Sequence, residues 1–404
     1  MSDAMDWTTG GWTKPGGPEI EAEIVISGDW APIRAFDEIV ERAPEAVYGN
    51  VLPVLRDAGL RITNLECPLT GERPVWKSGA VLKGRPAHVR GLTAVPFEIV
   101  TLANNHVFDY GRDAFRKTQE LLAANGVRSL GAGMSAGEAW RPLIIDLKGI
   151  PVGLVNFSEG EDLTAAIDGP GVFGWEIDRA ADEVRELRKT CAVVIAIGHA
   201  GVEYIPFPPP YVADAFRRLA EAGADLVIGH HPHVPQGIEV RRGVPICYSL
   251  GNFVFYQETD LLYRKVGYLV KAGVGRGGLG RLRIVPYEIG DGGLRLLDGG
   301  KLGRFMAALE KVSRPLADEA GVQDAWHGFL RRYGYAGFKK EIDLIMKTMA
   351  DEPRKGAAMF RNRLTTPQHF EHWRDGLTRV VDGTIGDSPD WACELANTWL
   401  TEKR

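Results

Sequence analysis

Short apolar runs alternate with amphipathic stretches from residue 21 to about residue 300 of this chain. The apolar runs are rich in Val and Ile and end at glycine or polar residues, which is typical of buried β-strands. They predict strands at residues 24–27, 60–63, 97–102, 193–197 and 226–228. Helical spacing of apolar residues predicts helices at residues 44–58, 112–125, 179–189 and 211–222. This alternation of strands and helices favours an α/β (α+β) fold.

Two β-hairpins are also predicted, because a turn signal separates two apolar runs in each case. Residues 143–147 and 152–155 flank Lys148-Gly149, and residues 237–240 and 245–249 flank Gly243. After about residue 300 the strand pattern gives way to helical periodicity with many aromatic residues. The helices expected there span residues 304–312, 324–332, 337–349 and 358–363.

These patterns divide the chain into three parts. Residues 1–20, rich in Gly, Thr and Trp, form a loose N-terminal arm. Residues 21–300 are expected to form the main domain, and residues 301–404 a helical C-terminal extension packed on it.

The composition of the chain argues against several classes of protein. Hydrophobic residues make up 45% of the chain, charged residues 25%, and the formal net charge is −5, which are ordinary values for a globular protein. The absence of a long basic run argues against a nucleic-acid partner. None of the four cysteines forms a Cys-x-x-Cys pair, so we expect reduced thiols. Without a secretory signal pattern or a bilayer-spanning apolar run, the sequence predicts a cytoplasmic protein with no membrane partner; its oligomeric state does not follow from the sequence.

Five predicted strands end at residues that can bind a metal ion. In chain order, these residues are Asp29, Glu66, Asn105 with His106, His199, and His231 with His233. Because the carboxyl ends of strands in α/β sheets converge on one edge, we expect these side chains to meet there. Carboxylate, amide and imidazole groups together form a mixed N/O donor set for a divalent metal.

The histidines have the same distribution. Five of the nine histidines lie in three of these strand-end motifs. In His231-Pro232-His233, both rings would face one side if the segment is extended, because side chains alternate along a strand. Taken singly, Asp29 could be a turn residue, Glu66 a helix cap, Asn105 a loop hydrogen-bonding residue and His199 a core histidine. The combination predicts a metal site.

A series of motifs occurs in order between about residue 21 and residue 297. These motifs are Gly28-Asp29, Asn64-Leu65-Glu66, Ala103-Asn104-Asn105-His106, Asp109-Tyr110-Gly111, Gly198-His199, Gly229-His230-His231-Pro232-His233-Val234, Gln236 and Tyr248-Ser249-Leu250-Gly251-Asn252-Phe253. The series resembles the CapA family, which is named for poly-γ-glutamate capsule synthesis and belongs to the calcineurin-like metallophosphoesterase superfamily.

The resemblance implies a two-layer β-sandwich flanked by helices, with a metal site at the sheet edge. It implies one or two divalent ions (Mn, Fe, Zn or Ca) and no organic cofactor. The implied ligands are Asp29, Glu66, Asn105, His199, His231 and His233. Glu66 would bridge two ions, and His106 would lie unligated beside the substrate. The residues expected to support the ligands or touch substrate are Asn104, Asp109, His230 and Asn252.

Two departures from the pattern of the superfamily bear on the chemistry. Its first strand usually carries Asp-x-His, whereas this chain has Asp29-Trp30-Ala31, and its bridging Asp is replaced by Glu66. One metal position is therefore expected to be weak, empty or filled by a harder ion.

Three functions are compatible with this site. In the first, metal-activated water hydrolyses a phosphoester or an amide, with His106 assisting the leaving group. In the second, the metal acts as a Lewis acid on a carbonyl, and bases on opposite faces remove and return a Cα proton. The second is preferred, because the resemblance extends to the metal-dependent peptide epimerases of lasso-peptide biosynthesis. The third is a non-catalytic metal-binding scaffold.

For epimerisation, the expected partner is a peptide, such as a ribosomally made precursor with a leader. The candidate bases are His106 and Glu203, and the candidate substrate contacts are Tyr204, Lys83 and Arg85. The simpler interpretation is a loop carboxylate for Glu203 and a solvated loop for Lys83 and Arg85.

Overall fold

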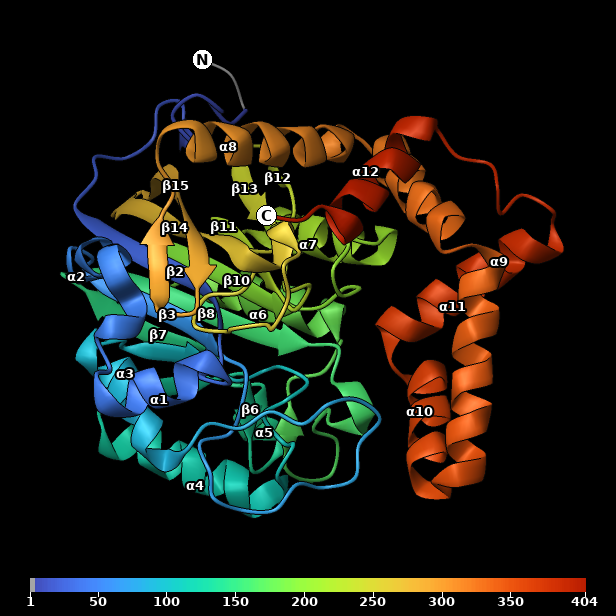
Figure 1. Ribbon diagram of the computed structural model, residues 1–404. Helices are drawn as coiled ribbons and strands as arrows, with labels where there is room; N and C mark the ends of the chain where they lie inside the picture. Colours follow the sequence, from blue (N-terminus) through green and yellow to red (C-terminus); the bar gives the residue numbers. More distant parts are fainter. Residues whose placement is uncertain (1–3) are drawn as a thin grey trace.

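The structure is a computed structural model that describes residues 4–404, so the first three residues of the predicted arm lie outside the described part. Its centre consists of two mixed β-sheets with helices on their outer faces (Figure 1). In spatial order, the first sheet contains β1 (Gly11–Thr13), β15 (Gly278–Gly290), β14 (Val266–Gly275), β2 (Ala22–Trp30), β3 (Leu60–Leu65), β4 (Ile99–Thr101) and β5 (Arg128–Leu130), with β16 (Gly293–Leu296) paired to β15. The second sheet contains β12 (Ile238–Arg241), β13 (Val244–Cys247), β11 (Leu226–His230), β10 (Val193–His199), β8 (Ile150–Ser158) and β7 (Leu143–Leu147).

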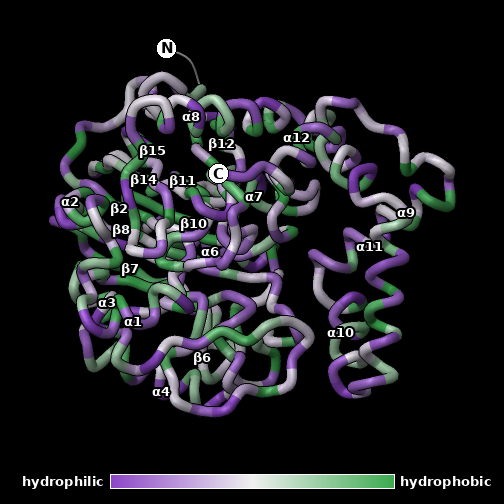
Figure 2. Tube along the Cα trace, in the orientation of Figure 1, coloured by the Kyte–Doolittle hydropathy of each residue, from purple (hydrophilic) through white to green (hydrophobic). Residues whose placement is uncertain are grey.

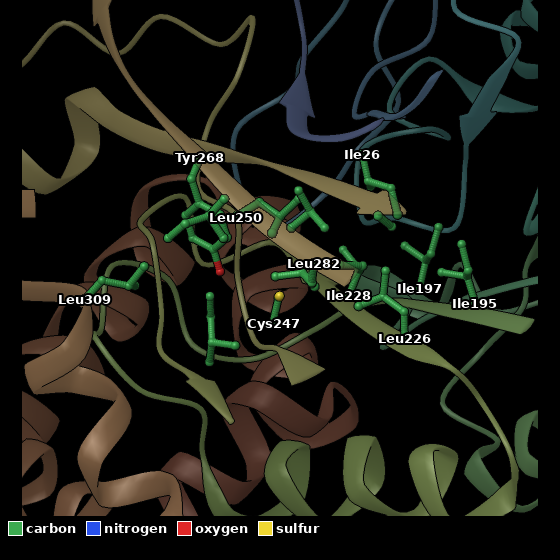
Figure 3. Packing of buried hydrophobic residues seen from close by; sticks show 14 of the residues in the cluster. Ile26, Ile195, Ile197, Leu226, Ile228, Cys247, Leu250, Tyr268, Leu282 and Leu309 are labelled. Carbon is green, nitrogen blue, oxygen red and sulfur yellow. The ribbon is translucent and has the colours of Figure 1, made fainter. Parts of the chain in front are cut away.

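The central strands β3, β10 and β11 are buried on both faces, because alternate residues point into different cores. Ile24 and Ile26 pack between the sheets, whereas Val25 packs under the outer helices. Figure 3 shows Ile26, Ile195 and Ile228 in the core between the sheets. This two-sided burial explains the nearly continuous apolar runs, which colour the central strands hydrophobic in Figure 2.

Helices cover the outer face of each sheet. The first sheet is covered by α1 (Ala35–Arg42), α2 (Leu52–Arg56), α3 (Val89–Ala94) and α4 (Gly111–Ala124), and the second by α6 (Ile177–Arg188) and α7 (Pro210–Ala222). Short elements connect them: β6 (Ala132–Gly133), β9 (Gly171–Val172) and α5 (Ala136–Ala139). The predicted α/β sandwich flanked by helices is confirmed, and so are both hairpins, β7–β8 and β12–β13.

Two local predictions are wrong. Part of the arm that was expected to be loose is ordered: β1 pairs with β15, and Trp12 is buried in the main core. The predicted helix over residues 44–58 is instead a 3₁₀ segment followed by the short helix α2. The break occurs at Gly49, whose φ of 47° is not helical, and Pro53 lies in the first turn of α2, where a missing N–H costs nothing.

The C-terminal region is helical and contributes to the central core. It contains α8 (Gly299–Ser313), α9 (Glu319–Asp351), α10 (Pro353–Thr365), α11 (Pro367–Val381) and α12 (Asp390–Thr401). Figure 1 shows α8 along one edge of the sheets and α9 to α12 beside them. Trp326, Phe338 and Trp399 belong to the same hydrophobic cluster as the strands between the sheets. No helix in the described part of the chain is both long and apolar enough to cross a membrane.

His372 of α11 is buried in an aromatic pocket of this region. Its ring lies 4.6 Å from Tyr333, 5.0 Å from Phe329 and 5.1 Å from Phe338, measured between ring centroids, and its Nε2 has no hydrogen-bond partner among the described residues. Burial lowers the pKa of His372 to about 3, because the charged ring would be desolvated.

Acidification is therefore expected to loosen the C-terminal helices. The unfolded chain takes up a proton on His372 near its ordinary pKa of about 6.5, whereas the folded chain does not. The stability that neutral His372 contributes is therefore complete above pH 6.5 and is lost as the pH falls. Between about pH 6.5 and pH 3, the free energy of unfolding decreases by up to about 1.4 kcal/mol for each pH unit. The melting temperature of a His372→Phe variant should fall less between pH 7 and pH 4 than that of the wild type. Equal slopes would contradict the assignment.

Candidate metal centre

The predicted ligands meet where the carboxyl ends of both sheets face each other. Asp29 lies near the end of β2, Glu66 directly follows β3, and Asn105 follows β4. His199 ends β10, and His231 follows the last residue of β11. Since β2, β3 and β4 are parallel to one another, as are β8, β10 and β11, each sheet presents its strand ends on one edge. All six predicted ligands, His233 included, are buried.

Two glycines, in β2 and β11, allow other segments of backbone to pack closely against these strands. A Cβ on Gly28 would lie 1.9 Å from the carbonyl oxygen of Gly251, and a Cβ on Gly229 would lie 1.9 Å from that of Tyr248. Only glycine fits at either position. The first contact places Asn252 against Asp29, since the two residues form an isolated β-bridge.

Four of the ligands form one compact group around Glu66. His199 Nε2 lies 2.9 Å from Asn105 Oδ1, 3.1 Å from His231 Nδ1 and 3.4 Å from Glu66 Oε1. Donor atoms about 2.1 Å from a common metal ion are separated by about 3.0–3.4 Å in octahedral or tetrahedral geometry. The spacing in this group matches such a coordination shell.

Asp29 and His233 form a second group that also approaches Glu66. His233 Nδ1 lies 3.5 Å from Asp29 Oδ2, and His233 Nε2 lies 3.7 Å from Glu66 Oε1. His230 Nδ1 is 3.3 Å from Asp29 Oδ1, so this histidine approaches the same carboxylate. Glu66 is thus shared by both groups, which is the position expected of a bridging carboxylate.

Buried carboxylate oxygens that lack hydrogen-bond partners indicate that a metal ion fits this site. Asp29 Oδ2 and both carboxylate oxygens of Glu66 are fully buried and accept no hydrogen bond from the described residues. Burial and the neighbouring charge of Asp29 raise the pKa of Glu66 well above its usual range. An unpaired buried carboxylate is costly, and a cation removes that cost. Together with His231 and His233, Glu66 offers donor atoms that lie within 4.8 Å of one another.

The imidazoles have protonation properties suited to ligands. Burial lowers the pKa of His199 and of His231, and the nearby His231 lowers that of His199 further. Both rings are therefore neutral near pH 7, as metal binding requires. Burial opposes the charged form of His233, but Glu66 and Asp29 outweigh it and raise the pKa of His233 to about 10.

The backbone of the His-Pro-His segment differs from the extended form expected from the sequence. His231 has φ of 98° and His233 has φ of 57°, both in the region that side chains other than glycine rarely adopt. The two rings still face each other, with centroids 6.0 Å apart. The convergence thus comes from a strained turn and not from strand alternation, and strain of this kind is common where a site is held in place by its surroundings.

Several asparagines hold the ligands in position. Asn64 Nδ2 donates to Asp29 Oδ1 at 2.8 Å and lies 3.3 Å from His199 Nδ1. Asn252 Oδ1 lies 2.9 Å from His233 Nδ1, and Asn104 Nδ2 donates to the carbonyl oxygen of Leu65 at 2.9 Å. Asn64 was not selected from the sequence, although it lies in the same strand-end motif as Glu66.

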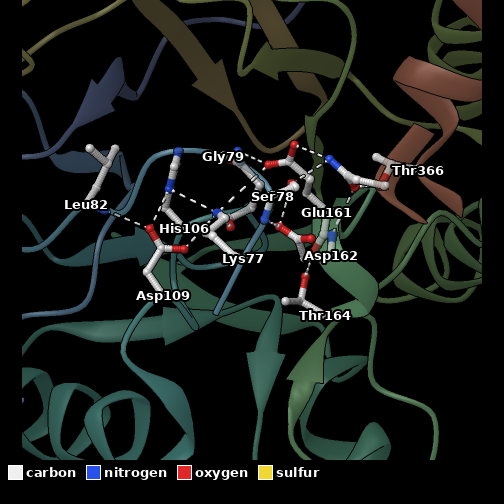
Figure 4. A network of polar contacts seen from close by, with 12 residues as sticks. Lys77, Ser78, Gly79, Leu82, His106, Asp109, Glu161, Asp162, Thr164 and Thr366 are labelled. Atoms are coloured by element: carbon white, nitrogen blue, oxygen red, sulfur yellow. Dashed lines mark hydrogen bonds and ion pairs between the residues drawn. The ribbon is translucent and has the colours of Figure 1, made fainter. Parts of the chain in front are cut away.

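His106 lies beside the ligands in a buried polar network (Figure 4). Its Nδ1 donates to Asp109 Oδ2 at 2.7 Å, and the Lys77 ammonium donates to Asp109 Oδ1 and to the Asn105 carbonyl oxygen, both at 2.8 Å. Burial opposes the charge on Lys77, but Asp109 and Glu161 raise its pKa. The network orients the His106 ring through its Nδ1, and His106 lines the cavity that opens onto the ligands.

The C-terminal helices contribute polar groups that sequence reasoning missed. Gln368 Oε1 accepts from His231 Nε2 at 2.9 Å, and the Gln368 N–H donates to Glu159 Oε2 at 2.8 Å. Glu161 bridges Asn105 and Asn362 through hydrogen bonds of 2.9 and 2.8 Å. Burial raises the pKa of Glu159 to about 7, against the hydrogen bonds it accepts. Glu159 directly follows β8 and Glu161 comes two residues later, so the strand-end criterion could have found them; nothing in the sequence indicated Gln368.

Gln368→Ala is expected to weaken metal binding about 10- to 100-fold, as loss of a hydrogen-bond partner of a ligating histidine typically does. The side chain fixes the proton of His231 on Nε2, which leaves Nδ1 to face His199 and Glu66. Titration with Mn²⁺ or Zn²⁺ against a competing chelator measures the change, and Gln323→Ala, at an exposed position of α9, serves as control. An unchanged affinity in Gln368→Ala would contradict this role.

A cavity of about 790 Å³ opens onto the ligands. Its lining includes Asn105, His106, Glu203, Tyr204 and His233 from the sandwich, and side chains of α9, α10 and α11 close the opposite wall. A larger cavity of about 1050 Å³ is lined by residues such as Leu262 and Phe305 and by none of the predicted ligands, so it is not the metal site.

Two predicted substrate contacts do not reach this cavity. Arg85 forms ion pairs with Asp37 and Glu41 of α1, and the Lys83 ammonium lies 5.2 Å from the centre of the Tyr110 ring. Neither side chain lines the cavity, because acidic and aromatic neighbours hold both of them elsewhere. This position corrects the expectation that they touch substrate.

The sequence of this chain matches a known family over most of the sandwich. Residues 23–257 match the family described as "Bacterial capsule synthesis protein PGA_cap". The chain belongs to this family. It is 28% identical to the PGA biosynthesis protein CapA of Bacillus subtilis over 65% of this chain and 70% of that protein. It is also 29% identical to a "Probable polyglutamine synthesis accessory protein" of Mycobacterium tuberculosis over 62% of this chain and 74% of that protein.

Likeness to solved structures is slight. A 5'-nucleotidase precursor from Thermus thermophilus shares 15% identity, with a TM-score of 0.42 over 66% of this chain and 54% of that chain. A hypothetical protein from the same organism gives 16% identity and a TM-score of 0.43, over 66% of this chain and 100% of that chain. The family match covers every predicted ligand, from Asp29 to His233. The last helices, which carry Gln368, lie outside it.

Proposed function

We propose that this chain is a metal-dependent enzyme that inverts a residue of a peptide at Cα. The observation that carries the proposal is the cavity beside the ligands, which is walled by two groups able to exchange protons, His106 and Glu203, from different loops. A divalent cation held by the six ligands would act as a Lewis acid on a substrate carbonyl and so acidify the adjacent Cα–H. No redox partner or organic cofactor is required for this reaction.

The residues of this chain would divide the proton transfers between them. One of the two bases takes the Cα proton, the electron pair passes into the enolate, and the conjugate acid of the other returns a proton to the opposite face. Asp109 accepts the Nδ1 proton of His106, so the Nε2 lone pair is available for this exchange. Glu203 lines the cavity with Tyr204, next to His233.

The substrate we propose is a ribosomally made precursor peptide that is processed in the cytoplasm. The names of the relatives connect them with glutamate polymers, so a γ-linked glutamate oligomer is the other substrate to compare. A peptide fits the cavity because its volume and its mixed polar and aromatic lining suit several residues.

Hydrolysis of a phosphoester or an amide is the second candidate. The observation that favours it is the shared position of Glu66 between two donor groups, which suits two cations. His106 would then protonate the leaving group.

Solvent deuterium distinguishes these functions. The metal-loaded protein is incubated in D₂O with γ-glutamate oligomers and with synthetic peptides encoded by genes next to that of this chain. Epimerisation should place one deuterium on the inverted residue, detected by mass spectrometry and by chiral analysis of the hydrolysed peptide. Cleaved product without Cα deuterium would favour the hydrolase and overturn the epimerase. Neither product, with metal bound, would favour a scaffold.

A further inference from the structure

Arg264 places a positive charge in the cavity that no carboxylate of the described residues neutralises by an ion pair. It lies on the 3₁₀ turn Leu262–Lys265, is half-buried and lines the cavity. Its guanidinium carbon is 3.5 Å from the centre of the Tyr204 ring. Arg363 in the same cavity is different, because Glu341 pairs with it at 2.6 Å. The cavity also contains Glu203 and Glu258, and neither lies within ion-pair distance of Arg264.

Tyr204 fixes Arg264 close to the metal ligands. The Tyr204 N–H donates to the carbonyl oxygen of Pro232 at 2.8 Å, inside the His-Pro-His segment. The Tyr204 ring lies 6.0 Å from the His233 ring, measured between centroids. One aromatic ring therefore separates the guanidinium from a metal ligand, and the stacking contact holds the guanidinium in a defined orientation.

We propose that Arg264, stacked on Tyr204, binds a carboxylate of the substrate and positions an acidic peptide over the metal ligands; this inference rests on the proposed function. A guanidinium binds a carboxylate through two parallel hydrogen bonds, which fix orientation as well as position. An extended peptide advances about 3.5 Å per residue, so the carboxylate belongs to the reacting residue or to one next to it. The carboxylate comes either from an acidic side chain or from the end of the peptide.

Binding of three probe peptides separates these sources. The probes are acetyl-Ala-Glu-Ala-amide, with only a side-chain carboxylate, acetyl-Ala-Gln-Ala with a free terminal carboxylate, and acetyl-Ala-Gln-Ala-amide, with none. Calorimetry measures their affinities for the metal-loaded wild type, for Arg264→Met, for Arg264→Lys and for Arg241→Gln. Arg241 is the control, because it lies outside the cavity and pairs with Glu221.

At least one carboxylate probe should bind the wild type about tenfold or more tightly than the neutral probe, since hydrogen bonds to charged groups are strong. Arg264→Met should abolish this preference, Arg264→Lys should keep part of it, and Arg241→Gln should leave it intact. Equal binding of all three probes to the wild type, including the lack of any binding, would overturn the proposal. A preference that survives in Arg264→Met would also overturn it, because the metal or another cation would then hold the carboxylate.

These measurements do not depend on turnover, so the two proposals can fail separately. A carboxylate preference that requires Arg264, in a protein that incorporates no deuterium, would retain the anchor and reject the epimerase. Deuterium incorporation at an undiminished rate in Arg264→Met would retain the epimerase and reject the anchor.

Discussion

Replacing His231 and His233 together with alanine is expected to remove the bound cation. His231 Nδ1 lies 3.1 Å from His199 Nε2, and His233 Nε2 lies 3.7 Å from Glu66 Oε1, so both rings offer donor atoms close to Glu66. Loss of both rings should lower metal affinity by much more than the roughly 10- to 100-fold cost of losing a hydrogen-bond partner of a ligand. Elemental analysis of the purified proteins measures the effect directly, as the number of ions per chain.

Thermal stability provides a second measurement of the same loss. A cation that binds only the folded state stabilises it by about 2.7 kcal/mol at a free concentration of 100 times its dissociation constant. A chelator should therefore lower the melting temperature of the wild type and leave that of the double variant unchanged. His327→Ala, a histidine that bonds to Gln323 outside the site, is the control and should behave as the wild type. Equal metal content in the double variant and the wild type would refute the assignment of these ligands.

His106→Ala is expected to lower turnover by about 10²- to 10⁴-fold while the metal content stays the same. The side chain lines the cavity and contacts Asp109 and Lys77, but it is not within the compact donor group. Substrate affinity and metal content should be measured together with turnover, on whichever substrate the deuterium experiment identifies.

The result separates three roles of His106. Unchanged turnover would mean that the ring takes no part in proton transfer. Loss of metal together with turnover would mean that it supports the ligands. Asp109→Asn serves as a comparison, because it keeps the size of the side chain and removes the charge that faces both His106 Nδ1 and the Lys77 ammonium; it should cause a smaller loss of turnover than His106→Ala.

Much of the sandwich followed from local patterns. Strands such as β10 are buried on both faces, so their sequences are almost entirely apolar and are easily recognised. Helices α1 and α3 were missed, since they contain only 8 and 6 residues. Helix α11 was missed because the residues that it buries, Gln368, His372 and Gly376, are not apolar. Helix α12 was missed as well.

The sequence by itself determined which residues meet at the candidate metal centre. Asp29, Glu66, Asn105, His199 and His231 each follow or end an apolar strand, and parallel strands bring such ends to one edge of a sheet. The order of strands and their turn glycines was therefore enough to predict that these side chains meet. It also predicted His106 as a neighbour of the ligands, since it directly follows Asn105.

Only the tertiary structure decided which groups surround the donors and which residues face the substrate. Gln368 lies 137 positions from His231, yet its amide oxygen holds the His231 ring. The turn that brings His231 and His233 together is strained, and local propensity favours the extended form instead. Acidic partners hold Arg85 outside the cavity, whereas Arg264 has no such partner among the described residues and lines the cavity. No local pattern in the sequence records such distant contacts. Packing of the C-terminal helices against the sandwich, and not any motif, therefore determines the wall of the cavity that lies opposite the sandwich.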